Sequence, residues 1–311
     1  MPVIHNRGIL LLGGGGFMGR ALTARLRARG HDVHILVRGT TLDVPDGVTV
    51  HGGGMENVEL LRRLLPRFKT VVHLASATTP GLSSKSPSLE SSGNIAPTLG
   101  LLEELQKFPG LRLVYVSSGG TVYGNPEHEM VPESAQLSPL SFYGAGKVAI
   151  EDFVQCFQRL SGNPVVILRP SNLYGPGQPR YQGFGVVRTM LQHVLDRSTM
   201  TIWGDGTVVR DFLYIDDMMS AIECVLDGTD ASGTFNVGAG VGHSLNDLKN
   251  IIEDVCGKRL DIRHEHPRSI DVQRIVLDSS NMEKQFGWTP LTGLWLGIAK
   301  TWEWLCAQKK L

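Results

Sequence analysis

Short apolar runs alternate with amphipathic stretches through the first half of the 311-residue chain. The runs have strand length and are almost entirely apolar, which is typical of strands buried in a parallel sheet. The stretches between them repeat apolar residues at helical spacing. The predicted strands are 9–12, 33–37, 48–51, 70–75 and 111–116, and the predicted helices are 20–29, 58–65, 94–108 and 143–160. This alternation predicts an α/β protein with a doubly wound parallel sheet of the Rossmann type.

The pattern becomes less regular beyond Pro170. A Gly-, Pro- and Gln-rich loop is predicted at 174–185, and extended segments are predicted within 263–276. In the first half, the Ser-, Pro- and Thr-rich segment 76–92 reads as a surface loop near the ligand. The remaining predicted elements are helices at 186–195, 216–226, 245–255 and 294–308 and short strands at 200–203 and 235–237.

A glycine-rich turn joins the first predicted strand to the first predicted helix. Gly13, Gly16 and Gly19 stand at G-x-x-G-x-x-G spacing, and a second strand follows the helix. Such a turn bends sharply, admits a pyrophosphate and points the helix N-terminus at it. Because the glycines lie between a strand and a helix, the turn predicts nucleotide binding rather than a merely flexible loop.

The end of the second predicted strand bears on the choice of cofactor. An acid there usually binds the hydroxyls of the adenosine ribose. This chain has Val37 and Arg38 instead. An arginine attracts a 2′-phosphate, although it can equally stack on adenine or face solvent. NAD and NADP therefore both stay open.

Tyr143 and Lys147 stand four residues apart at the start of the predicted helix 143–160. Residues at that spacing share one helix face, which makes the phenol and the ammonium neighbours. A free tyrosine has a pKa of about 10, and a nearby positive charge lowers it toward the range of a useful base. Gly144 and Gly146 disfavour a helix here, which hints that another group approaches this turn closely. Such pairs are also common on solvated helices, so the remaining motifs decide between the two readings.

Hydroxyl side chains follow the strand that ends at Val116. They are Ser117, Ser118 and Thr121. An open parallel sheet binds ligands at the carboxyl ends of its strands. We therefore expect these hydroxyls to face the same site as the nucleotide.

Composition excludes several classes of function. The chain has 30 basic and 30 acidic residues and no block of like charge, so no nucleic-acid partner is expected. The motif His264-Glu265-His266 could suggest a metal site, but the sequence indicates no third ligand for a metal ion. No metal site is therefore predicted. Four widely spaced cysteines suggest a reducing compartment. No apolar run approaches the roughly 20 residues that span a bilayer, and no signal peptide is recognised, so a cytoplasmic protein without a membrane partner is expected.

The motifs taken together resemble the extended short-chain dehydrogenase/reductase family, and within it the nucleotide-sugar enzymes of the UDP-glucose 4-epimerase type. The resemblance covers nearly the whole chain, and its motifs come in the family's order. The segments that carry it are Leu12–Gly19, His73–Ala75, Ser117–Gly124, Tyr143–Lys147, Leu168–Gln178, Trp203–Gly206, Val209–Phe212 and Phe235–Gly238.

The resemblance implies two domains and a cofactor site. A nucleotide-binding domain would comprise residues 1–169, with a return of the chain at about 210–238, and a smaller α/β lobe of 170–209 and 239–311 would bind the nucleotide sugar. Tyr143 would be the acid/base and Lys147 would hold the nicotinamide ribose. The implied cofactor contacts are Gly13, Gly16, Phe17, Met18, Gly19, Arg38, Leu74, Ala75, Asn94, Ser117, Tyr143, Lys147 and Pro170.

Substrate contacts are expected mainly in the second half. The guanidinium group of an arginine can bind a diphosphate in bidentate geometry. Arg180 is a candidate for this contact because it lies in a predicted loop. The resemblance implies that Arg210 and Arg268 bind the diphosphate, that Asp271 contacts the nucleotide ribose, and that Asn172 reaches both cofactor and sugar diphosphate. Ser118 would contact the sugar.

Three departures from the family are visible. The family's third catalytic residue is a Ser or Thr where this chain has Gly119, so Ser118, Thr121 or water must supply that hydroxyl. Val37 replaces the acid at the end of the second strand, and the segment 52–55 lacks the Asp that usually contacts adenine.

The resemblance implies a UDP- or dTDP-hexose 4-epimerase that oxidises C4 transiently with NAD or NADP. The alternative is an NADPH-dependent reductase of a nucleotide 4-keto-6-deoxy sugar. A dehydratase is disfavoured, because its usual acid pair falls at Gly120 and Thr121. A binding protein without catalysis is the third reading, with Gly119 as its only support. Helices 94–108 and 143–160 are where the family commonly forms a homodimer.

Overall fold

Seven parallel strands form the central sheet of the molecule. The computed structural model describes residues 8–39, 44–180, 185–228, 231–267 and 272–308. The spatial strand order is β10-β6-β5-β4-β1-β2-β3, and every pairing is parallel. The strands are β1 (Gly8–Leu12), β2 (Val33–Val37), β3 (Thr49–Gly52), β4 (Phe68–His73), β5 (Arg112–Val116), β6 (Val165–Pro170) and β10 (Gly233–Val237). The predicted Rossmann-type α/β fold is confirmed.

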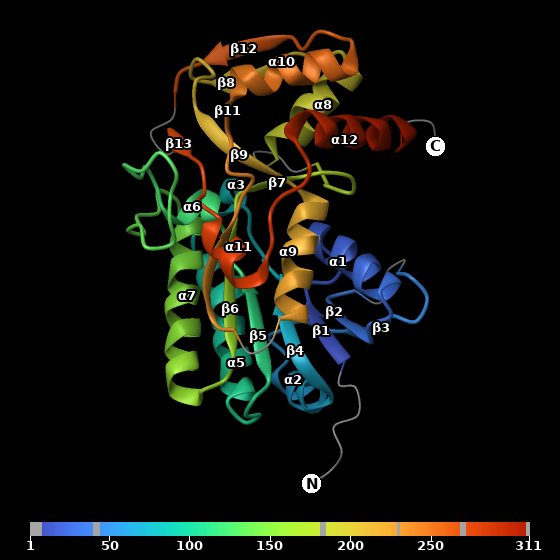
Figure 1. Cartoon of the computed structure of the whole chain (residues 1–311), viewed down its shortest axis with the longest axis vertical. Coiled ribbons are helices and arrows are strands. Elements are labelled where there is room, and N and C mark those ends of the chain that lie inside the picture. The colour runs from blue at the N-terminus through green and yellow to red at the C-terminus, as the bar shows by residue number, and fades with distance from the viewer. Residues whose placement is uncertain (1–7, 40–43, 181–184, 229–230, 268–271, 309–311) are drawn as a thin grey trace.

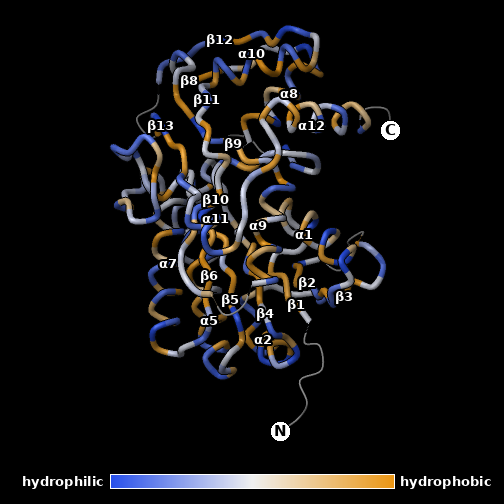
Figure 2. Tube along the Cα trace, viewed as in Figure 1, coloured by the Kyte–Doolittle hydropathy of each residue, from blue (hydrophilic) through white to orange (hydrophobic). Residues whose placement is uncertain are grey.

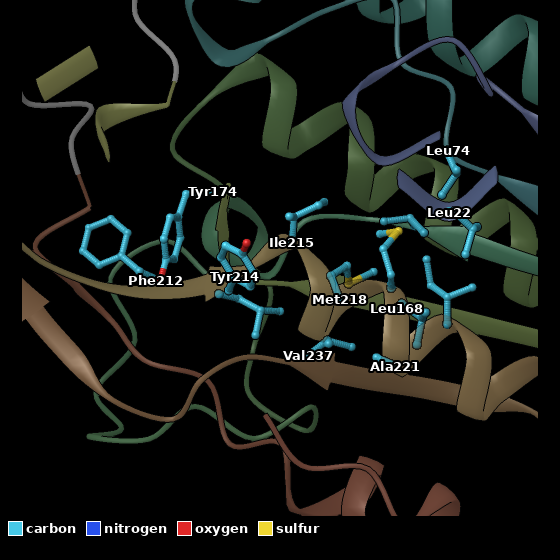
Figure 3. Close-up of a cluster of buried hydrophobic side chains, with 14 of the residues drawn as sticks. Leu22, Leu74, Leu168, Tyr174, Phe212, Tyr214, Ile215, Met218, Ala221 and Val237 are labelled. Carbon is cyan, nitrogen blue, oxygen red and sulfur yellow. The ribbon is translucent and has the colours of Figure 1, made fainter. Parts of the chain in front are cut away.

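Helices cover both faces of this sheet (Figure 1). Alternate residues of one strand point to opposite faces. Ile9 and Leu11 therefore pack under α1 (Phe17–Ala28) and α9 (Ile215–Asp227). Figure 3 shows Met218 and Ala221 of α9 near Leu168 of β6 and Val237 of β10. Leu10 and Leu12 pack on the opposite face, which is covered by α2 (Val58–Leu64), α5 (Ala96–Leu105) and α7 (Phe142–Ser161).

The second half of the chain adds a smaller lobe above the carboxyl ends of the strands (Figure 1). Its central strand β9 (Val209–Tyr214) pairs with β7 (Asn172–Tyr174), β11 (Gly242–Ser244) and β13 (Arg274–Ile275). A second pair of strands joins β8 (Met200–Trp203) to β12 (Ile262–Glu265). Three helices complete the lobe: α8 (Val186–Asp196), α10 (Leu245–Cys256) and α12 (Leu294–Gln308). In Figure 2 hydrophobic and hydrophilic residues alternate along α10, as expected for an amphipathic helix. The remaining helix, α11 (Ser280–Phe286), packs against β10 and α9 of the large sheet.

Several elements differ from the sequence prediction. The segment predicted as a loop at 76–92 contains α3 (Pro80–Ser83), α4 (Ser88–Glu90) and the start of a π-helical turn (Ser91–Ile95) that leads into α5. Thr79 starts α3, because its side chain accepts a hydrogen bond from the Leu82 amide at 3.3 Å. A 3₁₀ turn (Leu65–Arg67) extends α2, and a short helix α6 (Gly119–Val122) follows β5. Helix α1 begins three residues earlier than predicted, directly at the end of the glycine turn.

Neither a membrane-spanning helix nor a metal-binding cluster is present among the described residues. Among the residues that the structure describes, no helix is long and apolar enough to cross a membrane. Within the same ranges, no group of three or more His, Cys, Asp or Glu residues could hold a metal ion.

Candidate active site

A cleft lined by the predicted motifs lies where the strand order reverses, at the carboxyl ends of β1 and β4. Its volume is about 740 Å³, within the range of cofactor sites in proteins. Open α/β sheets bind ligands at this switch point. The predicted cofactor residues that line it are Gly13, Gly16, Phe17, Met18, Gly19, Arg38, Leu74, Ala75, Asn94 and Tyr143.

The glycine turn has the shape that a dinucleotide requires. Gly13 has a φ of +86°, and a Cβ there would lie 2.8 Å from the Ala75 backbone. A Cβ on Gly19 would overlap the Gly13 carbonyl and lie 2.6 Å from the Gly14 Cα, so only glycine lets α1 pack so close to the turn. Gly16 precedes α1 without a side-chain cap, which leaves amide groups of the first turn available to a phosphate. The residues present therefore fit a bound dinucleotide.

Two opposite charges lie at the adenosine end of the cleft. The Gly53 amide donates to the Val37 carbonyl at 2.8 Å, which sets the loop after β3 beside the end of β2. Arg38 lines the cleft from β2, and Glu56 lines it from that loop. A Cβ on Gly54 would overlap the Glu56 carboxyl group. Glu56 is the one carboxylate among the described residues of the lining. The sequence did not predict it, because an acid was expected only at position 37 or within 52–55.

Tyr143 and Lys147 lie on the first turns of α7. Ser141 starts this helix by accepting a hydrogen bond from the Gly144 amide at 3.1 Å. The Lys147 Nζ lies 5.7 Å from the centre of the Tyr143 ring and donates to the Val116 carbonyl at 3.1 Å. Lys147 is buried behind Tyr143 rather than in the cleft lining described above.

The protonation of this pair is set by burial and by neighbouring carboxylates. Burial lowers the pKa of Lys147 to about 8, opposed by the charges of Glu90 and Glu151. Burial also raises the pKa of Tyr143 above its ordinary value, Glu90 raises it further, and a hydrogen bond with Ser118 lowers it. The Tyr–Lys spacing alone predicted a lowered tyrosine pKa. That prediction is wrong in direction for this structure, because desolvation outweighs the favourable contacts.

The structure separates the two hydroxyls that could replace the one missing at Gly119. The Ser118 side chain hydrogen-bonds Tyr143. The Thr121 hydroxyl instead donates to the Ser118 carbonyl at 3.3 Å within its own turn. Gly119 has no room for a side chain, because a Cβ would lie 2.6 Å from Leu277 Cδ1 and 2.8 Å from the Arg169 carbonyl.

Besides Lys147, two predicted cofactor residues lie outside the lining of the cleft. Ser117 is buried, and its hydroxyl donates to the Glu151 carboxylate. Glu151 also accepts from the Arg169 guanidinium at 2.6 Å, which completes a buried ion pair behind the site. Pro170 ends β6 and lies opposite Val237 in the sheet.

The predicted substrate residues are dispersed. Asn172 donates to the Asp211 carbonyl at 3.1 Å and approaches the turn at Gly120. Arg210 is half-buried on β9. Arg180 is exposed and lies 3.7 Å from an Asp196 carboxylate oxygen, outside the cleft lining. Arg268 and Asp271 lie outside the described residues.

Comparisons with known proteins agree with this geometry. The sequence model of the NAD dependent epimerase/dehydratase family matches residues 9–238. A UDP-glucose 4-epimerase of Mycolicibacterium smegmatis is 33% identical, with 94% of this chain and 97% of that protein covered. A dTDP-4-dehydro-6-deoxyglucose reductase of Escherichia coli is 28% identical, covering 95% and 94%.

Two solved structures have the same fold over nearly their whole length. The UDP-glucose 4-epimerase of Thermotoga maritima, solved with UDP-glucose, gives a TM-score of 0.91 at 28% identity, covering 97% of this chain and 99% of that one. The UDP-glucose 4-epimerase of Thermus thermophilus, solved with NAD, gives 0.89 at 31% identity, covering 96% and 98%.

Proposed function

Because the chain belongs to the NAD-dependent epimerase/dehydratase family, we propose that it is a nucleotide-sugar 4-epimerase that interconverts UDP-glucose and UDP-galactose. The observation that carries the proposal is the position of Tyr143 in the lining of a cleft whose glycine turn fits a dinucleotide. UDP-glucose 4-epimerases are among the relatives and solved structures that match this chain over nearly their full length.

The residues of the site fit the proton transfers of this reaction. A bound nicotinamide supplies hydride transfer to and from C4 of the sugar. Tyr143 would accept the proton of the 4-hydroxyl in its phenolate form and return it from the resulting phenol, because among the described residues it is the titratable hydroxyl that lines the cleft. Ser118 hydrogen-bonds the phenol and orients it. The buried Lys147 ammonium lies behind the ring, 5.7 Å from its centre.

The cofactor, which the sequence left open between NAD and NADP, is NAD. The charges at the adenosine end agree with this choice. Glu56 can accept hydrogen bonds from the ribose hydroxyls, and its charge opposes a 2′-phosphate that Arg38 alone would attract. It thereby takes over the part usually played by an acid at the position of Val37.

Fewer residues support the proposed contacts to the sugar nucleotide than support the cofactor site. We propose that Asn172 and Arg210, which stand on the paired strands β7 and β9, face the diphosphate. Arg268 and Asp271 remain predictions for the same ligand. Arg180 is the weakest of these candidates, because it is exposed beside Asp196.

One experiment tests the function against its rival. The purified protein should retain NAD and convert UDP-glucose to a mixture with UDP-galactose without added cofactor. Analysis of the retained nucleotide by mass spectrometry and of the sugars by chromatography measures both. The similarity to the Escherichia coli reductase supports the second candidate. A nucleotide-free protein that consumes NADPH stoichiometrically with a nucleotide 4-keto-6-deoxy sugar would replace the epimerase assignment.

The two hydroxyls after β5 should differ in their effect on turnover. We expect Ser118→Ala to lower kcat by roughly 10- to 100-fold, because it removes a hydrogen bond to a group that becomes charged during the reaction. Thr121→Ala is the matched control, since its hydroxyl serves the local turn, and its kcat should stay within about threefold of wild type. Equal losses in both variants would contradict the assignment. Initial rates at saturating UDP-glucose measure the difference.

We also propose that the protein is a homodimer through α7. Phe153, Cys156 and Leu160 are exposed, and their spacing places them on one side of that helix. Phe142 extends the exposed apolar surface at the helix start. Light scattering during gel filtration should give twice the 33.9 kDa mass of the chain, whereas a single-chain mass would refute the dimer.

A further inference from the structure

A buried carboxylate that raises the pKa of both Tyr143 and Lys147 lies behind the proton-transfer centre. Glu90 ends α4, and its side chain is only 6% exposed. Its Oε2 accepts a hydrogen bond from the Asn94 amide group at 2.8 Å. Its Oε1 has no hydrogen-bond partner among the described residues. A charge buried with so few partners is costly, and such groups are found where function requires them.

Glu90 is connected to the wall of the cofactor cleft through Asn94. The Asn94 amide nitrogen donates to Glu90 and also to the Thr78 hydroxyl at 2.8 Å. The Asn94 carbonyl oxygen accepts from the Ala77 amide at 2.7 Å. Ala77, Thr78 and Asn94 all line the cleft. One carboxylate therefore anchors the residue that holds this part of the wall in place.

The carboxylate also contacts the helix that carries the reacting tyrosine. The segments α3, α4 and the π-helical turn pack against α7. A Cβ on Gly146 would lie 2.7 Å from the Glu90 Oε2 and 3.3 Å from its Cβ. Gly146 stands between Tyr143 and Lys147 in the sequence. This contact explains why a glycine that weakens the helix occupies that position.

The charge of Glu90 acts on both members of the pair. It raises the pKa of the Tyr143 phenol and the pKa of the Lys147 ammonium. The other groups that face Lys147 are Glu151 on the same helix, the Tyr115 ring 5.1 Å away on β5, and the neutral, buried His73 on β4.

We propose that Glu90 is a positioning residue of the proton-transfer centre, whose carboxylate ties Asn94 and the cleft wall to helix α7 at Gly146, between Tyr143 and Lys147. The inference rests on the proposed epimerase function for its kinetic consequences. The tie itself is a property of the NAD-binding protein and is measurable without turnover.

The tie is tested by filling the space at Gly146. Gly146→Ala replaces a poor helix former by the best one and would ordinarily stabilise α7. Here we expect at least a tenfold weaker affinity for NAD, measured by isothermal titration calorimetry, because the new methyl group displaces the Glu90 carboxylate. Gly100→Ala in α5 is the matched control, since its Cβ would lie 3.5 Å from Val58 Cγ2 in ordinary contact, and its affinity should match wild type. Unchanged NAD affinity in Gly146→Ala would overturn the tie.

The charge is tested by Glu90→Gln, which keeps an acceptor for Asn94. We expect NAD affinity within about threefold of wild type, because the hydrogen bond remains. The pH at which activity falls to half on the alkaline side should drop by about one unit, because Lys147 loses a stabilising negative charge and releases its proton earlier. Glu90→Asp keeps the negative charge, so its activity should fall to half at the same alkaline pH as that of the wild type. Its KM should change rather than its kcat.

The two failures are distinguishable. A wild-type protein without epimerase activity would refute the proposed function and leave the NAD-affinity comparison as the test of the tie. If the wild type is active and Glu90→Gln loses activity at the same alkaline pH, the role of the charge is overturned. Circular dichroism of each variant separates these outcomes from a loss of folding.

Discussion

Tyr143→Phe should lower kcat by roughly 100- to 10,000-fold, the range attributed to a positioned general acid/base. The phenol lines the cleft next to Ser118, and it belongs to the one tyrosine among the described residues of the lining. Other tyrosines near the site are unsuitable. The Tyr115 hydroxyl is buried without a partner among the described residues, and the Tyr123 hydroxyl is occupied by Asn236 and Arg169. Conversion of UDP-glucose under saturating conditions measures the loss.

The same variant should bind nucleotides almost as well as wild type. Phenylalanine keeps the ring, and it removes only the hydroxyl that reacts. Calorimetric titration with NAD and with UDP-glucose should give dissociation constants within about threefold of wild type. A Tyr143→Phe protein with undiminished turnover would exclude the tyrosine as the proton-transfer group. Loss of binding and turnover together would instead indicate a structural role.

Gly19→Ala should cost about 3 kcal/mol or more of folding stability, at the upper end of the overpacking range, and abolish NAD binding. The added methyl group would overlap the Gly13 carbonyl and press on the Gly14 backbone. Backbone cannot rotate away as a side chain can, so α1 has to move from the turn that it supports. Because this turn forms the phosphate site, the displacement removes the binding geometry as well.

A matched glycine elsewhere controls for the substitution itself. Gly293 precedes α12, and a Cβ there meets no atom within 4 Å, so Gly293→Ala should leave melting temperature and NAD affinity unchanged. Thermal unfolding followed by circular dichroism, with and without NAD, measures both effects. A Gly19→Ala protein that melts and binds NAD like wild type would show that the turn tolerates a side chain.

The repetitive part of the fold was predictable from local pattern. β1 and the C-terminal helix Leu294–Gln308 are nearly or fully as predicted, because an apolar run and an amphipathic repeat each encode one element. The glycine turn was recognisable because Gly13 and Gly19, close together in sequence, both stand where a side chain would clash with backbone. The segment 76–92 was not, since its short helices depend on Thr79 capping and on packing against α7.

The chemistry of the site was less predictable than its location. Spacing alone placed Lys147 beside Tyr143, but it carries no information on desolvation or on Glu90, which arrives from another segment. The choice between Ser118 and Thr121 depends on the rotation of one short turn. Arg180, proposed from its loop position, lies beside Asp196 and stays a prediction.

The position of β10 at the edge of the large sheet has a consequence for biosynthesis. β10 pairs with β6, although the whole of β7, β8 and β9 lies between them in sequence. A growing chain therefore exposes the β6 edge on the ribosome until residues 233–237 have emerged. Unpaired edges of this kind invite association between chains, and late, long-range pairing is slow. A nascent chain that pauses within the smaller lobe is the species of this protein most in need of a chaperone.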